Sequence, residues 1–537
     1  MEELKALHRN PEGLNRQHFD VMIIGGGING AGLARDLALR GIRTALVDKD
    51  DFGSGTSSAS TKLIHGGLRY LENFDLRLVF EACRERKTLL AIAPHLVWPL
   101  RFYVPVYKGD KRPLWMVRAG MLLYDLLAMF RNTHIHGMLG PDKAVSREPA
   151  LRRQGLKGVA VYWDCQMDDA RLCLENVIAA AEAGATVANY IRLDAFTFSE
   201  GKISGISLTD LEAGSRIETS ADVVINMTGP WMDKVRTLAG DHEPMLRTTR
   251  GAHILVPRVN RGDEAIYLSS QVDDRLFFVI PWGELSLIGT TDTDTDRPPE
   301  ETVATEEDID YLLRESARHL QDTSLTRDCV IASFAGLRPL VSDTRDTASK
   351  VSREHRIFES ASGLISVGGG KYTTYRAVAE EVAGLIAERI GKGFGSSRTA
   401  SVPLPGGDLE NIENEYERLT GSGYGPSALV RQLVKRYGSR AAKVLSLARG
   451  TPELLEPVCP GSELTRLEVQ YSVQFELART PEDLLRRRTG LALEEGCGIR
   501  ELDPVADQMQ QILGVSAEVK ENWKSNYREK YFRNGRT

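Results

Sequence analysis

The sequence predicts an α/β fold that begins near residue 20 and is followed by a helical C-terminal region. Three observations predict it. An apolar run, Val21–Ile24, opens into the glycine-rich segment GGGING. A helical pattern then stops at Gly41, and a second apolar run, Thr44–Val47, closes on Asp48. Beyond about residue 400 the apolar residues recur with a helical period. The first two observations describe a strand, a tight turn, a helix and a second strand.

The glycine-rich turn contains the pattern G-x-G-x-x-G, and Asp48 lies 23 residues beyond its first glycine. Gly25 permits a tight turn, Gly27 lets the backbone approach a pyrophosphate, and Gly30 lets helix and strand pack closely. The N–H groups at the helix N-terminus favour an anion. The Asp48 carboxylate can accept hydrogen bonds from both ribose hydroxyls. We therefore predict a dinucleotide site; the alternative is a glycine-rich turn in an ordinary βαβ unit.

The composition is that of an ordinary globular protein, with 42% apolar and 26% charged residues. A chain of 537 residues is long enough for about two to four domains. The net charge of −6 argues against nucleic acid as a partner. Six cysteines without C-x-x-C spacing predict a reduced protein with neither a disulfide framework nor a zinc site.

Two segments bear on membranes. Residues 1–18 lack the apolar core of a signal peptide. The most apolar segment, Pro113–Phe130, is interrupted by Arg118 and Asp125, so no transmembrane helix is predicted. This segment is expected to be either a core helix or a helix that lies on a membrane surface.

The C-terminal tail carries Trp523, Tyr527 and Tyr531 at helical spacing among basic residues. Such a stripe fits a terminal helix docked on the body of the protein. The alternative is an interfacial anchor for anionic lipid.

Glycine and hydroxyl-bearing residues follow further predicted strands. The loop after Asp48 is rich in Ser, Thr and Gly, the strand Val223–Asn226 breaks at Thr228-Gly229, and a third strand ends in the glycines before Lys371. Helices are expected over about 75–93 and over Asp169–Ala183.

Basic residues recur beside these glycine turns and suggest a convergent anion pocket, because a phosphate dianion needs several charge-assisted donors. The alternative is a set of separate surface residues. The residues concerned are Lys62, Arg69, Arg338 and Lys371, with His65 and His253. The run DTDTD at 292–296 lacks the Gly and Glu of a calcium loop, so no metal is predicted.

Seven motifs resemble, in order, those of the FAD-dependent, quinone-linked glycerol-3-phosphate dehydrogenases. They are IIGGGINGAGLARD, TSSASTKLIHGGLRYLE, MTGPW, FFVIPW, IGTTDTD, GLRPL and GGGKYTTYR. The resemblance spans about residues 20–395. It implies a glutathione-reductase-like, D-amino-acid-oxidase-like FAD-binding fold with a β-rich substrate domain and an all-α C-terminal domain. The expected ranges are 19–95, 155–240 and 346–395 for FAD binding, 96–154 and 241–345 for substrate, and 400–537 for the helical domain.

The resemblance also implies roles for particular residues. FAD would be bound non-covalently, and the substrate would be held by Arg69, Tyr70, Arg338 and Lys371. His253 is expected as the base, with Arg338 or Lys371 stabilising the developing alkoxide. The expected FAD-binding residues are Gly25, Gly27, Gly30, Asp48, Thr56, Ser57, Ser60, Lys62, His65, Gly66, Gly67, Gly229, Gly369 and Gly370.

The family's reaction implies oxidation of glycerol 3-phosphate to dihydroxyacetone phosphate, with electrons passed to ubiquinone or menaquinone. Because quinones are lipid-soluble, a cytoplasmic enzyme peripherally associated with the inner face of the membrane is expected. A homodimer is compatible with these features. The absence of an EF-hand extension favours the aerobic bacterial type. Three alternatives remain: an FAD-dependent 2-hydroxyacid or amine oxidase on the same fold, a non-catalytic flavin-binding protein, and a NAD-linked enzyme.

Overall fold

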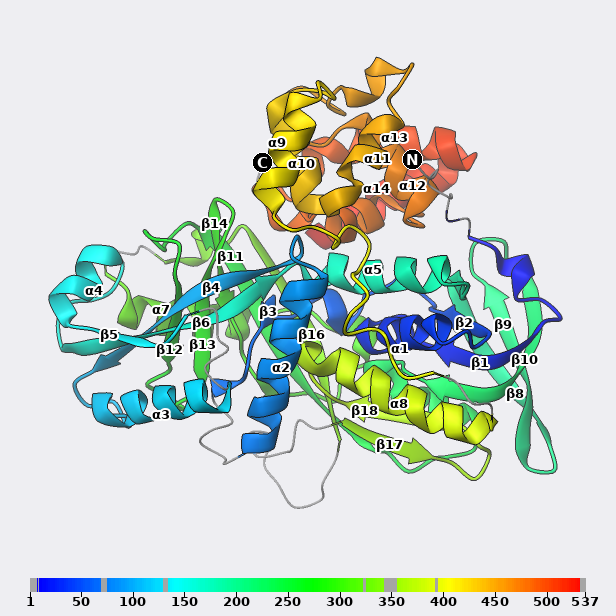
Figure 1. The fold of residues 1–537 in the computed structure, drawn as a ribbon, viewed down its shortest axis with the longest axis horizontal. Coiled ribbons are helices and arrows are strands. Elements are labelled where there is room, and N and C mark those ends of the chain that lie inside the picture. Colours follow the sequence, from blue (N-terminus) through cyan, green and yellow to red (C-terminus); the bar gives the residue numbers. More distant parts are fainter. Residues whose placement is uncertain are drawn as a thin grey trace.

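Two β-sheets and a helical C-terminal domain make up the protein, as the computed structural model shows (Figure 1). The structure describes residues 7, 9–68, 75–128, 134–321, 325–341, 355–391 and 395–531. Arg69 and Tyr70, expected to bind substrate, lie outside the described residues.

The first sheet contains the predicted strand–turn–helix–strand unit. Its order is β17-β18-β10-β1-β2-β7, with β8 and β9 continuing from β10. β1 pairs in parallel with both β2 and β10, so the carboxyl ends of these strands meet at one edge. The strands are β1 (His18–Ile24), β2 (Thr44–Val47), β7 (Thr186–Ala188), β8 (Ile191–Ser199), β9 (Lys202–Asp210), β10 (Arg216–Asn226), β17 (His355–Glu359) and β18 (Ile365–Gly369).

The second sheet is mostly antiparallel and has the order β15-β11-β14-β13-β12-β4-β6-β3. In addition, β16 pairs with β11, and β5 pairs with β6. Its strands are β3 (Leu63–Ile64), β4 (Val97–Tyr107), β5 (Gly137–Leu139), β6 (Leu156–Met167), β11 (Leu246–Pro257), β12 (Ala265–Ser269), β13 (Leu276–Trp282), β14 (Leu285–Gly289), β15 (Thr293–Asp294) and β16 (Ala332–Val341).

Helices cover the two sheets and form the C-terminal domain. Those associated with the sheets are α1 (Ile28–Leu39), α2 (Leu76–Ile92), α3 (Leu114–Leu127), α4 (Pro141–Arg147), α5 (Asp169–Glu182), α6 (Met232–Leu238), α7 (Glu306–His319) and α8 (Tyr375–Ile390). The C-terminal domain contains α9 (Ile412–Gly421), α10 (Ser427–Tyr437), α11 (Ala441–Ser446), α12 (Arg466–Phe475), α13 (Ile499–Leu513) and α14 (Ala517–Tyr531). The helices expected over 75–93 and 169–183 are confirmed as α2 and α5.

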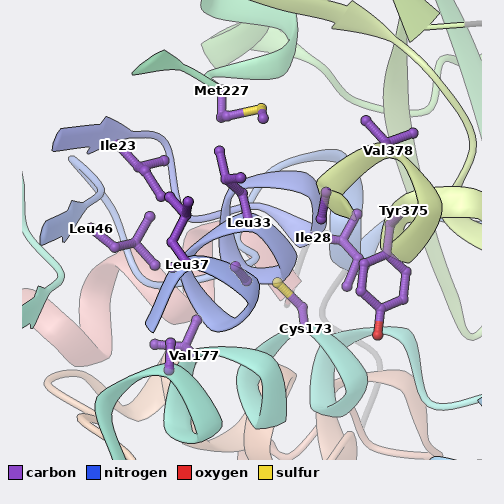
Figure 2. Close-up of a cluster of buried hydrophobic side chains, with 14 of the residues drawn as sticks. Ile23, Ile28, Leu33, Leu37, Leu46, Cys173, Val177, Met227, Tyr375 and Val378 are labelled. Carbon is purple, nitrogen blue, oxygen red and sulfur yellow. The ribbon is translucent and has the colours of Figure 1, made fainter. Parts of the chain in front are cut away.

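The core of the first sheet is built around α1 (Figure 2). Leu33 and Leu37 of this helix are fully buried against strand residues such as Ile23. On its other sides α1 contacts α5 and α8, which contribute Val177 and Tyr375. Burying a leucine side chain contributes roughly 1.5–3 kcal/mol. This packing fixes the helix whose N-terminus follows the glycine turn.

The strand β6 belongs to the second sheet, although the range 155–240 was expected to lie wholly in the FAD-binding part. β6 runs antiparallel to β4, with Val97 opposite Met167 at one end of the pairing and Tyr107 opposite Leu156 at the other. β3, inside the expected range 19–95, pairs with β6 in the same sheet. The expected domain ranges stay a prediction; extended backbone-to-backbone pairing, which local sequence does not reveal, decides the sheet to which a strand belongs.

The C-terminal helix α14 is docked on its own domain. Tyr527 is 1% exposed, and its hydroxyl donates to the carbonyl of Cys497 at 2.7 Å. The hydroxyl of Tyr531 donates to Glu482, and Trp523 packs on the same apolar cluster. The aromatic stripe therefore faces the protein interior, which contradicts its reading as a lipid anchor.

Candidate active site

A cavity of about 600 Å³ lies where the carboxyl ends of the parallel strands meet the second sheet. Its volume is in the range of small-molecule and cofactor sites. The first sheet contributes Gly25, Asp48 and Gly229 to the wall, and the second contributes His253 and Arg338. Ligands of open α/β sheets bind at this edge.

The glycines of the turn are required by close backbone approach. Gly25 has φ of +106°, and a Cβ there would lie 2.6 Å from the carbonyl oxygen of Met227. At Gly30 a Cβ would lie 1.9 Å from the carbonyl oxygen of Gly25. Gly25 and Gly27 line the cavity, whereas Gly30 lies behind its wall, where helix and strand pack closely. Substitution at Gly25 or Gly30 would force the turn apart.

Asp48 lies at the end of β2 and holds the glycine turn. Its carboxylate accepts from the backbone N–H of Gly26 at 2.6 Å and from that of Asp50 at 3.0 Å. Burial raises the pKa of Asp48 to about 7, against the opposing effect of these hydrogen bonds. A ligand whose hydroxyls donate to this carboxylate would favour its ionised form.

The hydroxyl-rich loop after Asp48 closes over the same edge. Ser57 Oγ accepts from the backbone N–H of Ile28, at the start of α1, at 2.9 Å. Thr56 Oγ1 donates to the carbonyl of Leu337 on β16, and Ser60 Oγ donates to Asp169. All three hydroxyl residues line the cavity. The loop therefore connects the first sheet to the second.

Two residues expected to bind the cofactor lie behind the cavity wall. Lys62 is 2% exposed, and its ammonium group pairs with Asp169 at 2.5 Å. The backbone N–H of Gly66 donates to Tyr124 and Asp164. A buried ammonium group requires a counter-charge, which Asp169 supplies. Both residues therefore support the wall from outside, and their expected contact with the cofactor stays a prediction.

His253 projects from β11 toward the cavity. It is 2% exposed, its ring stacks on Phe334 at 4.9 Å, and Nε2 lies 3.0 Å from Thr61 Oγ1. Burial, followed by the charges of Arg338 and Lys62, holds the pKa of His253 well below its usual range. The imidazole is therefore neutral at physiological pH.

Arg338 reaches the cavity from β16, opposite Thr249 on β11. Its guanidinium donates to Asp292 at 3.0 Å, to Thr290 Oγ1 at 3.1 Å and to the carbonyl of Thr291 at 3.2 Å. These acceptors hold the planar donor group in one orientation, which suits recognition of a planar or tetrahedral oxyanion.

Lys371 enters the cavity from the end of β18. Gly369 and Gly370 precede it with φ of +78° and +86°, a conformation that residues with a Cβ rarely adopt. Lys371 therefore lines the same cavity as His253 and Arg338.

Most of the predicted site residues thus meet in one cavity, and several others were missed. His65, Gly67 and Gly229 line it as expected. The missed residues are Asn29, Thr61, Thr290 and Asp292, which line the cavity, and Phe334, which stacks on His253. The first four lie in the motifs IIGGGINGAGLARD, TSSASTKLIHGGLRYLE and IGTTDTD, which could have pointed to them, whereas Phe334 has no such signal.

FAD fits these residues. The cavity wall carries the first glycine turn with the N-terminus of α1 and, beside them, the glycines of a second turn, since a Cβ on Gly370 would lie 3.9 Å from Asn29 Nδ2. The buried Asn29 Oδ1 has no hydrogen-bond partner among the described residues, although Asn29 lines the cavity. A bound cofactor would satisfy such an atom.

The fold and the site define an FAD-dependent oxidoreductase. The family described as "FAD dependent oxidoreductase" matches residues 20–385, and the "C-terminal domain of alpha-glycerophosphate oxidase" matches residues 397–520. A glycerol-3-phosphate dehydrogenase from Synechocystis is 39% identical over 90% of this chain and 91% of its own. An aerobic glycerol-3-phosphate dehydrogenase from Staphylococcus epidermidis is 33% identical over 96% of this chain and 94% of its own.

The crystal structure of the glycerol-3-phosphate dehydrogenase from Bacillus halodurans, complexed with FAD, superposes with a TM-score of 0.81. It is 30% identical, covering 97% of this chain and 95% of that chain. The chain therefore belongs to the FAD-dependent glycerol-3-phosphate dehydrogenase family.

Proposed function

We propose that this protein oxidises sn-glycerol 3-phosphate at C2 to dihydroxyacetone phosphate. The observation that carries the proposal is the meeting of His253, Arg338 and Lys371 in one cavity beside the Gly369–Gly370 turn. The activities printed for the relatives support the same substrate. When bound, FAD supplies the acceptor for the hydride that leaves C2.

Cationic groups recognise the substrate phosphate in this proposal. Arg338 is held by Asp292 and Thr290, and Lys371 enters from the neighbouring turn. Arg69 and Tyr70 complete the set by the family resemblance. A phosphate dianion is bound well by several charge-assisted donors, whereas a carboxylate is satisfied by one bidentate arginine.

His253 is the proposed proton acceptor. The proton leaves the C2 hydroxyl for the neutral imidazole as the C2–H bond breaks and the C=O bond forms. Arg338 or Lys371 stabilises the negative charge that develops on the C2 oxygen. Thr61, at 3.0 Å from Nε2, orients the ring.

The cofactor assignments are also proposals, and the geometry separates them into two groups. The residues that line the cavity are proposed to contact FAD: Gly25, Gly27, Asp48, Thr56, Ser57, Ser60, His65, Gly67, Gly229, Gly369 and Gly370. Gly30, Lys62 and Gly66 are proposed to shape the wall from behind. The first sheet with α1, α5 and α8 is the proposed FAD-binding part, and the second sheet the substrate part.

Electrons are proposed to pass on to a membrane quinone, either ubiquinone or menaquinone. None of the described helices combines the length and the apolarity needed to cross a bilayer. The helix α3 nevertheless exposes Trp115, Leu122 and Leu126 on one face, at 69%, 56% and 57%. We propose that this face lies on the inner surface of the cytoplasmic membrane.

The other face of α3 leads toward the cavity. Its residues Met121 and Tyr124 belong to an apolar cluster that includes Tyr162 and Tyr267, which line the cavity wall. An apolar path of this kind would suit a quinone that approaches from the lipid.

The test is anaerobic mixing of the purified protein with glycerol 3-phosphate while the visible flavin absorbance is followed. Bleaching is expected with glycerol 3-phosphate, followed by recovery when a soluble quinone is added. Glycine and 2-hydroxyglutarate are the controls. Bleaching with either control instead would identify an amine or 2-hydroxyacid oxidase, and no bleaching with any of them would identify a non-catalytic flavin-binding protein.

A further inference from the structure

Three successive arginines of the C-terminal domain are buried beside the loop that follows β2. Arg486, Arg487 and Arg488 lie in a π-helical segment, Asp483–Arg488. Thr480 caps this segment by accepting from the backbone N–H of Asp483. We call Asp48–Ser60 the ribose loop, because its first residue is the acid expected at the ribose.

Asp51 of the ribose loop is the acceptor for two of these arginines. Arg487 Nε donates to Oδ2 at 2.5 Å. Arg488 donates to both carboxylate oxygens, at 2.5 and 2.9 Å. The Asp51 and Arg488 side chains are both 0% exposed. Two domains that are far apart in the sequence are therefore joined by a dry ion-pair network.

Arg486 contacts both the ribose loop and the second sheet. Its guanidinium donates to the backbone carbonyl of Ser58, in the ribose loop, at 2.7 Å. It also lies 5.2 Å from the ring centroid of Phe334, the residue on which His253 stacks. One short segment of the helical domain thus contacts both the ribose loop and Phe334, the residue that supports the ring of His253.

The ribose loop in turn holds the parts of the cavity expected at the cofactor. The backbone N–H of Gly53 donates to the carbonyl of Gly26 at 3.0 Å, and Ser57 accepts from the N–H of Ile28 at 2.9 Å. Asp48 accepts from Gly26. Displacement of the loop would therefore move the glycine turn and the α1 N-terminus as well.

The charges explain why the loop depends on the arginines. Burial alone would raise the pKa of Asp51, but Arg488 and Arg487 overcome it and hold this pKa at about 2. Without an arginine, the buried carboxylate would lose its counter-charge, and the loop would have to open toward water.

We propose that Arg486, Arg487 and Arg488 are positioning residues for FAD: they lock the ribose loop in its binding conformation, so that the C-terminal domain sets the affinity for the cofactor. Because coupling between two sites is reciprocal, bound FAD would also stabilise the Asp483–Arg488 segment.

The first experiment compares Arg488→Met with the parent protein. FAD is titrated into the apoprotein and binding is measured by quenching of flavin fluorescence, with the melting temperature of the apoprotein recorded in parallel. At least a tenfold weaker affinity is expected, and Arg488→Lys should restore part of it. The matched control is Arg376→Met, since Arg376 forms a buried bidentate pair with Glu85 away from the cavity wall.

Two further variants keep the test decisive if Arg488→Met folds poorly. Asp51→Asn removes the negative charge but keeps an amide oxygen that can accept from the arginines; it should bind FAD more weakly, and its melting temperature is recorded beside that of the parent. In the double variant with Arg488→Met, the loss should be smaller than the product of the two single losses. Hydrogen exchange of residues 483–488 should slow on FAD addition in the parent and not in Asp51→Asn.

Unchanged FAD affinity in both Asp51→Asn and Arg488→Met would overturn the proposal. So would an equal loss of affinity in Arg376→Met, because the effect would then be one of general destabilisation. Failure of glycerol 3-phosphate to bleach the flavin would leave these binding results unaffected.

Discussion

At the scale of single residues, His253 shows how position sets chemistry. A histidine in solution titrates near neutral pH. Here, burial and the neighbouring charges of Arg338 and Lys62 hold the pKa far lower, so the ring stays neutral. A neutral imidazole that faces a cavity with two cationic residues can accept a proton while the cations bind the anion.

His253→Ala is expected to lower kcat by about 10²- to 10⁴-fold, the usual contribution of a general base. Flavin content should not change. Because the pKa of His253 lies well below its usual value, the imidazole remains neutral as the pH falls to about 6. The parent's kcat should therefore show no loss near the pKa of a free histidine. A fall in kcat with an apparent pKa of about 6.5, absent from the variant, would contradict the lowered pKa, and an unchanged kcat in the variant would exclude His253 as the base.

Asp48 makes FAD binding depend on pH. Burial raises its pKa to about 7, so its carboxylate is increasingly protonated below that pH. Ribose hydroxyls donate best to the ionised form, and FAD affinity should fall by up to about tenfold between pH 7 and pH 6. FAD titrations across this range measure it. Asp48→Asn should bind weakly and without this slope, whereas Asp50→Asn should keep it; a slope retained in Asp48→Asn would exclude Asp48 as its source.

At the scale of elements, α3 and α14 place their large apolar side chains differently. The sequence left two interpretations open for each helix, one packed on the protein and one on a membrane surface. In α14 the aromatic residues face the domain interior, with Tyr527 1% exposed. In α3, Trp115, Leu122 and Leu126 face outward. The choice depends on which neighbouring elements cover each helix, and this is decided by tertiary packing.

Trp115→Glu combined with Leu126→Glu should release the protein from vesicles that contain anionic phospholipid. The exposed positions tolerate charge, so folding should be retained, while apolar contact with the lipid is lost. Sedimentation with vesicles measures the bound fraction. Phe198→Glu, at a half-exposed position on β8 at the opposite end of the molecule, is the control (Figure 1). Equal release by the control, or unchanged binding of the double variant, would exclude α3 as the membrane contact.

At the scale of the whole molecule, the cavity and the arginine segment join three parts of the chain. Both sheets line the cavity, and the C-terminal domain contacts the ribose loop through Asp51. Buried ion pairs thus connect the C-terminal domain to the ribose loop. Removing only one partner of such a pair is costly, because the other charge is left buried without a counter-charge.

The FAD-loaded protein should therefore unfold in a single thermal transition, with the calorimetric enthalpy equal to the van't Hoff enthalpy. Excess FAD should raise the midpoint, since a ligand at about 100 times its Kd stabilises by about 2.7 kcal/mol. Differential scanning calorimetry measures both effects. Two separate transitions, only one of which responds to FAD, would show that the C-terminal domain unfolds independently.

The sequence by itself determined the strand–turn–helix–strand unit, the cofactor class and the family. The unit depends on residues that interact locally: Gly25, Gly27 and Gly30 in one turn, and Asp48 at the end of the next strand. FAD and the family came instead from the resemblance of seven ordered motifs. Apolar periodicity, a local property, also predicted the helical C-terminal domain.

Only the tertiary structure decided the rest. It brought His253, Arg338 and Lys371 to one cavity, assigned β6 to the second sheet and placed Lys62 behind the cavity lining. It also revealed that Arg487 and Arg488 pair with Asp51, more than 400 residues away in the chain. Contacts at such separations depend on strand pairing and domain docking, whose energies come from surfaces that meet only in the folded protein, so no local pattern records them.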